Sequence, residues 1–172
     1  MNDSRLPTSG RRYTRSFGFS RETSIQYGDV FISHQSNDRP AAEKVALTLG
    51  RMGYPCYLGI FDPSVAGNDP YLESYLRQVI GRCRALMAIV SPATRSSWWV
   101  PLEIGVALEK EKHIATFLLT EVDLPSYLWL WPMLRDDQDA VSWANDLGKY
   151  SVTQINHYWR ARTRLQKRSY AG

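Results

Sequence analysis

The chain has 172 residues, 44% of them hydrophobic and 22% charged, with a formal net charge of +4 at pH 7. These values are typical of one soluble globular domain with a core of its own. No apolar run approaches the roughly 20 residues needed to cross a bilayer, so we expect no membrane partner. The chain begins without the apolar segment of a signal peptide, and its two cysteines form no metal pattern, so we expect a cytoplasmic location.

The basic residues gather at the two ends of the chain, within 5–21 and 160–168. Such tails are more typical of solvated arms than of a nucleic-acid-binding surface. No basic stripe interleaved with aromatic residues lies between them, which disfavours nucleic acid as a partner. The pattern predicts a basic, flexible N-terminal segment over 1–26, a single domain over 27–166 and a C-terminal tail over 167–172.

The predicted elements alternate between strands and helices. A first apolar strand over 27–33 leads to a helix over 41–52, which Pro40 opens, Asp38 is placed to cap and Gly53 ends. A strand over 54–58, a long loop over 59–70 and a helix over 71–82 follow. The run 85–91 has no polar interruption, which is typical of a strand buried on both faces.

The second half of the chain continues the alternation less regularly. A third helix begins near Ser97 or Trp98, and a fourth strand covers 114–119. We interpret 123–134 as an irregular wall at the sheet edge, predict a short fifth strand over 140–143, and expect Asn145 or Asp146 to cap a final helix ending near Gln166. Alternating elements of this kind predict an α/β fold with a parallel sheet covered on both faces, whose ligands gather at the carboxyl ends of the strands.

Trp99 and Glu103 lie one helical turn apart, at that predicted edge. A Trp ring can stack on a flat heterocycle, and a carboxylate can stabilise positive charge that develops on a sugar carbon. The pair therefore suggests chemistry on a nucleotide. A buried Trp and a solvent-facing Glu on an ordinary amphipathic helix is the alternative.

Other catalytic patterns are absent from the sequence. Neither a GxGxxG fingerprint nor a GxxxxGK[ST] loop occurs, and there is no GxSxG elbow. The three histidines have no Cys, His or carboxylate at metal-ligand spacing, so we expect neither a metal nor a bound cofactor. Glu103 is left as the main candidate for a reacting group.

Four segments in order carry a resemblance to a known family: DVFISH in the first strand, FDPSVAG over 61–67, IVSP at the third strand and SSWWVPLEIGVAL across the third helix. Together they resemble a bacterial Toll/interleukin-1 receptor (TIR) domain. The resemblance implies a flavodoxin-like, doubly wound parallel sheet of five strands. In many bacterial members it also implies cleavage of NAD+ at the bond between nicotinamide and ribose.

The resemblance also implies roles for particular residues. Its W-x-x-x-E arrangement makes Glu103 the catalytic residue, with Trp99 as its aromatic partner. The expected substrate contacts are Ser33, His34, Gln35, Asp62, Ser97, Trp98 and Trp99. Many relatives end the second strand with an acidic residue, whereas this chain has Gly59 there.

The implied reaction agrees with elementary chemistry. Nicotinamide leaves NAD+ as a neutral molecule and needs no general acid, while the ribose becomes oxocarbenium-like and is stabilised by a fixed carboxylate. Because Glu103 lies near a helix start, we expect the helix dipole to keep it ionised. The acceptor is either water, which gives ADP-ribose, or a hydroxyl of the same molecule, which gives a cyclic product.

The chain is similar to the TIR subunit of Thoeris-type antiphage systems. That similarity implies a cyclic ADP-ribose signal that activates a separate effector protein, and self-assembly through TIR–TIR contacts. Two alternatives remain open: a non-enzymatic TIR scaffold that assembles through its long second loop, and a nucleoside deoxyribosyltransferase-like enzyme, which shares the fold type and a glycosidic-bond Glu.

Overall fold

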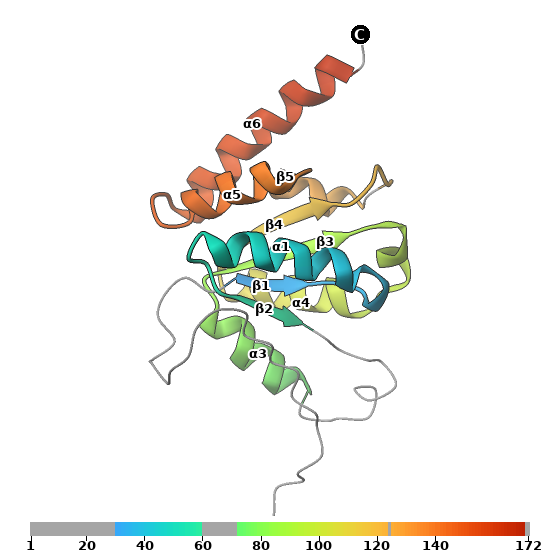
Figure 1. The fold of residues 1–172 in the computed structure, drawn as a ribbon, viewed down its shortest axis with the longest axis vertical. Coiled ribbons are helices and arrows are strands. Elements are labelled where there is room, and N and C mark those ends of the chain that lie inside the picture. Colours follow the sequence, from blue (N-terminus) through green and yellow to red (C-terminus); the bar gives the residue numbers. More distant parts are fainter. Residues whose placement is uncertain (1–29, 60–71, 124, 171–172) are drawn as a thin grey trace, which may run out of the picture.

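The structure is a computed structural model that describes residues 30–59, 72–123 and 125–170 (Figure 1). Its centre is a sheet of five parallel strands in the order β2-β1-β3-β4-β5. The strands are β1 (Val30–Ser33), β2 (Cys56–Gly59), β3 (Ala85–Val90), β4 (His113–Leu118) and β5 (Met133–Leu134). The predicted parallel α/β fold is confirmed, and β3 is buried along its whole length, as its apolar sequence predicted.

Helices cover both faces of the sheet. They are α1 (Arg39–Arg51), α3 (Leu72–Arg82), α4 (Trp99–Glu109), α5 (Asp137–Asp146) and α6 (Val152–Tyr170), with short 3-10 helices η1 (Ser36–Asp38), η2 (Pro92–Ser96) and η3 (Ser126–Leu130). One hydrophobic cluster joins the sheet to α1, α5 and α6, and another joins the opposite face to α3, α4 and η3. In Figure 1, α1 lies in front of the sheet and α4 behind it.

Helix α1 begins and ends as the sequence predicted, with one exception. Pro40 lies in its first turn, and Gly53 follows its end with a φ of +86°, a left-handed conformation that glycine adopts without strain. Asp38 occupies the N-cap position, but its side chain makes no capping hydrogen bond. The prediction that Asp38 caps α1 is therefore wrong, because its carboxylate accepts a hydrogen bond from Ser91 instead.

The prediction of a fifth strand over 140–143 is wrong, because these residues lie within α5. The Asp136 side chain caps that helix by accepting a hydrogen bond from the Asp139 backbone N–H at 2.8 Å. Ala140 and Trp143 are both fully buried at a spacing of three, which a helix satisfies and a strand does not. The edge strand is β5, inside the segment that we interpreted as irregular.

The N-terminal cap of α6 also differs from the prediction. Asn145 and Asp146 are the last residues of α5 rather than the cap of the final helix. Ser151 takes that role: its hydroxyl accepts a hydrogen bond from the Gln154 N–H, and the Gln154 side chain accepts one from the Ser151 N–H. This is a reciprocal capping box, which the S-x-x-Q sequence encodes.

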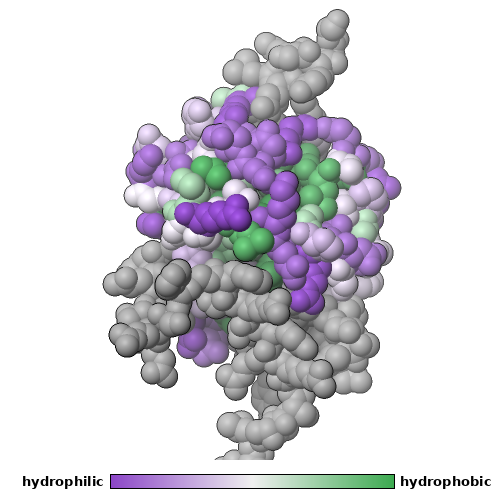
Figure 2. Space-filling view, in the orientation of Figure 1, coloured by the Kyte–Doolittle hydropathy of each residue, from purple (hydrophilic) through white to green (hydrophobic). Residues whose placement is uncertain are grey.

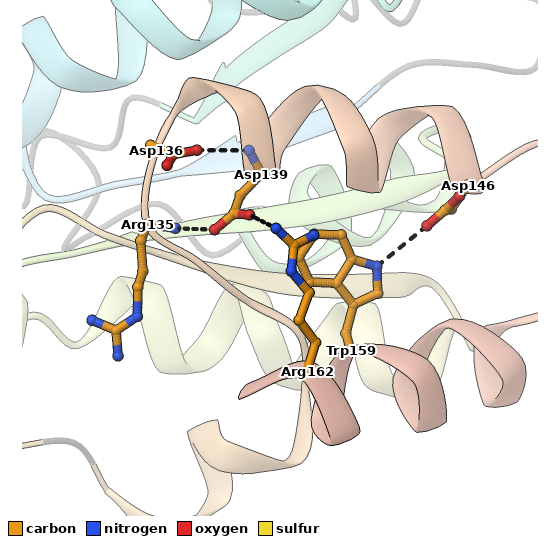
Figure 3. A network of polar contacts seen from close by, with 6 residues as sticks. All are labelled: Arg135, Asp136, Asp139, Asp146, Trp159 and Arg162. Atoms are coloured by element: carbon orange, nitrogen blue, oxygen red, sulfur yellow. Dashed lines mark hydrogen bonds and ion pairs between the residues drawn. The ribbon is translucent and has the colours of Figure 1, made fainter. Parts of the chain in front are cut away.

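Polar contacts hold α6 against α5 (Figure 3). The Arg162 guanidinium pairs with the buried Asp139 carboxylate at 2.7 Å and lies 4.7 Å from the centre of the Trp159 ring. The Trp159 indole N–H donates to Asp146 at 3.3 Å. These contacts fix the first half of α6 to α5, while the end of the helix extends away from the sheet in Figure 1.

No helix in the described ranges is long and apolar enough to span a membrane. The N-terminal segment over 1–26, most of the second loop and the last two residues lie outside the described residues.

Candidate functional site

Glu103 lies one turn into α4, on the face of that helix that packs against the sheet. It is 1% exposed, so the alternative of a solvent-facing Glu is wrong. A Cβ placed on Gly59 would lie 3.1 Å from its Oε1 atom. Gly59 pairs in register with Ser33 at the carboxyl ends of β2 and β1. The carboxyl group of Glu103 is therefore placed at the strand ends where parallel α/β sheets bind their ligands.

Burial raises the pKa of Glu103 to about 8, because a charged carboxylate loses its hydration there. The Ser33 hydroxyl favours the ionised form and offsets a smaller part of this shift. Its oxygen is fully buried and makes no hydrogen bond of regular geometry with the described residues. The expectation that the helix dipole keeps Glu103 ionised at neutral pH is wrong, because desolvation outweighs the dipole.

An aromatic ring forms the apolar wall of this site. A Cβ on Gly59 would lie 2.5 Å from Cζ of Phe31, so the ring occupies the space that a side chain at position 59 would need. Phe31 and Ser33 are two residues apart on β1 and project from the same face of the sheet. Sequence reasoning noted Gly59 but missed Phe31. The only sequence feature that could have indicated Phe31 is the alternation of side chains along a strand, which puts residues 31 and 33 on the same face.

His34 and Gln35 follow β1 directly. His34 is 7% exposed, and its Nδ1 lies 3.3 Å from the Ile32 carbonyl oxygen. Because that oxygen can only accept, Nδ1 carries the proton and Nε2 is left as an acceptor. Burial lowers the pKa of His34, which keeps the ring neutral. The Gln35 side chain accepts a hydrogen bond from the Asn37 N–H at 2.7 Å and so shapes its own loop.

A buried hydrogen bond joins the loops after β1 and β3. The Ser91 hydroxyl donates to Asp38 Oδ2 at 2.8 Å, and both residues are buried. The same hydroxyl accepts from the Ala93 N–H, while Thr94 Oγ1 accepts from the Ser91 N–H. Asp38 thus fixes the loop that carries His34 to the one that leads into α4. Sequence reasoning missed this contact because the two residues are far apart in the chain.

The remaining candidates fall in different places. Trp99 is partly buried and lies one turn before Glu103. The Ser97 hydroxyl accepts a hydrogen bond from the Val100 N–H at 3.3 Å and so stabilises the first turn of α4. Trp98 is 86% exposed. It is turned about 140° around the helix from Glu103, so the structure does not bring the two together. Asp62 lies outside the described residues.

Within the described ranges, no group of three His, Cys, Asp or Glu side chains is close enough to hold a metal ion. The site therefore offers the carboxyl group of Glu103, the Ser33 hydroxyl beside it and an apolar wall. Such a set can stabilise a cationic centre once the carboxyl group is ionised.

A family model described as TIR domain matches residues 30–150. The chain belongs to the TIR domain family. The match includes every strand and every α-helix described in this TIR domain except α6, which begins at Val152. No curated protein matches the chain.

Among solved structures, the TIR domain of the Toll-related receptor TRR-2 from Hydra magnipapillata is similar, with a TM-score of 0.52 and 18% identity over 70% of this chain and 98% of that one. This likeness agrees with the TIR fold. Lower TM-scores are found for the CMP N-glycosidase BcmB of Clostridium botulinum (0.46, 17% identity, 71% and 99% coverage) and for the TIR domains of the activated Roq1 resistosome (0.44, 20% identity, 78% and 80% coverage).

Proposed function

We propose that this TIR domain is an NAD+ glycohydrolase or ADP-ribosyl cyclase that cleaves the bond between nicotinamide and ribose. The observation that carries the proposal is the carboxyl group of Glu103, placed beside Gly59 and Ser33 at the carboxyl edge of the sheet. As the C–N bond breaks, its electron pair leaves with nicotinamide, and the carboxylate stabilises the cationic ribose carbon.

Because the pKa of Glu103 is raised, the substrate itself must help to ionise this carboxyl group. In the free protein the carboxyl group is mostly protonated at pH 7, since its pKa is about 8. The nicotinamide ring of bound NAD+ is cationic, and a positive charge nearby lowers the pKa of a carboxyl group. Substrate binding therefore ionises Glu103 in the complex, and the side chains over the carboxyl group must move for the ribose to reach it.

The other candidates have supporting roles in this proposal. Ser33 stabilises the carboxylate or contacts a ribose hydroxyl, and Trp99 stacks on a ring of the substrate. His34, with Nε2 as an acceptor, is placed to bind a sugar hydroxyl, and Gln35 and Ser97 act by shaping the loops. A contact from Asp62 or Trp98 remains part of the proposal only if substrate binding rearranges those segments.

Free nicotinamide, measured by liquid chromatography after incubation with NAD+, tests the proposal. We expect release by the parent protein and a loss of about a hundredfold or more in Glu103→Gln, because one such electrostatic contact is worth on the order of 3 kcal/mol. Glu109→Gln is the matched control: the same change on the same helix, at an exposed carboxylate. Equal activity of Glu103→Gln and the parent would overturn the proposal.

The burial of Glu103 is the one observation that favours the non-enzymatic scaffold. A scaffold would release no nicotinamide even when self-assembled through TIR–TIR contacts, so the assay is run on both dilute and assembled protein. Base exchange on deoxynucleosides, with NAD+ untouched, would indicate the deoxyribosyltransferase-like alternative.

We further propose that the product is a cyclic ADP-ribose signal that activates a separate effector in the cytoplasm, as in Thoeris-type antiphage defence. This rests on the family resemblance alone. Mass spectrometry separates the two products, because hydrolysis adds one water to the ADP-ribosyl group and cyclisation adds none.

A further inference from the structure

His34 is a buried side chain with one open nitrogen. The residue is 7% exposed, and its Nδ1–H faces back along the chain toward the Ile32 carbonyl oxygen. Nε2, on the other side of the ring, makes no hydrogen bond with a described residue. It does not belong to the described side-chain atoms that are sealed from solvent without a partner. His34 therefore presents a single free acceptor at the carboxyl edge of the sheet.

His34 and Glu103 approach the end of β1 from opposite faces of the sheet. The Ser33 hydroxyl lies beside the Glu103 carboxyl group, and the Cα of His34 follows that of Ser33 at about 3.8 Å. The described charged side chains near His34 belong to the start of α1 and the turn before it: Asp38, Arg39 and Glu43. Because α1 lies in front of the sheet and α4 behind it in Figure 1, a ribose over the end of β1 would lie between the imidazole and the carboxyl group.

The reaction proposed above leaves one proton to be taken up. After nicotinamide has left with the electron pair of the C–N bond, a water molecule or a substrate hydroxyl adds to the cationic ribose carbon. A lone pair of the acceptor oxygen forms the new C–O bond, and the oxygen must then lose its proton.

We propose that Nε2 of His34 is the general base that takes this proton, so that His34 is a second catalytic residue. The electron pair of the O–H bond stays on oxygen, and the proton forms an N–H bond with Nε2. This inference rests on the proposed function, because it assigns a step of that reaction to a particular atom.

The surroundings of His34 suit a base. Burial lowers the pKa of His34, and Arg39 acts in the same direction, so the ring is neutral and able to accept at pH 7. The carboxylates of Asp38 and Glu43 favour the imidazolium that the step forms. The side of the domain on which α1 lies is mostly hydrophilic in Figure 2, so the proton can leave to water there.

A neutral pyridine separates a base from a residue that only shapes the site. 3-Acetylpyridine attacks the same ribose carbon through its ring nitrogen and has no proton to lose, so this exchange needs Glu103 but no general base. Liquid chromatography of NAD+ incubated with 3-acetylpyridine measures both outcomes in one sample. The readout is the ratio of ADP-ribose plus cyclic product to exchanged dinucleotide.

We expect this ratio to fall at least about tenfold in His34→Asn, because general base catalysis typically contributes a hundredfold or more. The Asn amide N–H replaces Nδ1–H against the Ile32 carbonyl oxygen, whereas Nε2 has no counterpart. His34→Gln is the second variant if His34→Asn does not fold. It places an amide near the position of Nε2, and the same fall is expected because an amide is not a base at neutral pH.

Two controls complete the experiment. Glu103→Gln should slow both outcomes and keep their ratio, because cleavage of the C–N bond precedes both. His113→Asn makes the same change at another partly buried histidine, at the amino end of β4, and should behave like the parent.

An unchanged ratio in the His34 variants, whether both rates fall together or neither falls, would overturn the inference and leave the proposed function standing. A parent protein that releases no nicotinamide would overturn both.

Discussion

Glu103→Gln should stabilise the folded protein in a way that depends on pH. The folded-state pKa of Glu103 is about 8, against an ordinary value of 4.5, so between these values the folded state binds more protons than the unfolded state. Stability from the protonated carboxyl group is therefore complete below pH 4.5 and is lost as pH rises to 8. Gln has the same size and no proton to lose, so it avoids this loss.

The size of the effect follows from the shift. At 1.36 kcal/mol per pKa unit, the carboxyl group costs on the order of 3 kcal/mol at pH 7 and about 5 kcal/mol above pH 8. Urea unfolding of both proteins at pH 5, 7 and 8.5 measures the difference. We expect the advantage of Glu103→Gln to grow by about 1.4 kcal/mol per pH unit from pH 5 until it levels off near pH 8. A constant difference between the proteins would refute the reasoning, and Glu109→Gln should show no such slope.

Three further predictions concern the site. Under the proposed function, kcat/KM should rise about tenfold per pH unit up to about pH 8, because the free enzyme must lose the Glu103 proton. The plateau of kcat should come at lower pH, because bound NAD+ lowers the pKa of Glu103 in the complex. A kcat/KM for nicotinamide release that stays flat from pH 6 to 9 would contradict this. Ser91→Ala leaves the buried Asp38 carboxylate without its donor and should cost about 1–3 kcal/mol in urea unfolding, whereas Ser91→Thr, which keeps the hydroxyl, should lose less. Gly59→Ala should cost about 1–3 kcal/mol by pressing on Phe31, and Phe31→Leu in the same chain should recover part of it; a neutral Gly59→Ala would show that the ring moves freely.

Much of the fold could be predicted from local sequence because local patterns determine it. The unbroken apolar run of β3 and the Pro40 and Gly53 signals around α1 each correspond to an observed element. The segment 140–143 was assigned wrongly, since a short apolar run fits either a strand or a helix. The deciding feature was the Asp136 cap, four residues earlier.

The site could be predicted only in outline. The spacing of Trp99 and Glu103 indicated one face of a helix, which the structure shows. The protonation state of Glu103 could not be inferred from its own helix, because its pKa depends on burial against Phe31 of β1 and Gly59 of β2. Helical periodicity alone could have predicted that Trp98 lies on the exposed face, because Trp98 is five residues from Glu103 and so points to another side of the helix.

The hydrogen bond between the Asp38 and Ser91 side chains restricts where this domain can accept insertions and deletions. Each residue reaches the other only because the turns after β1 and β3 are short and of fixed geometry. Ser91 follows β3 directly, so an inserted or deleted residue between β1 and Asp38 would separate the two side chains and leave a buried carboxylate without its donor. Related chains that keep this pair should therefore keep a constant number of residues between β1 and the aspartate, while insertions and deletions accumulate elsewhere.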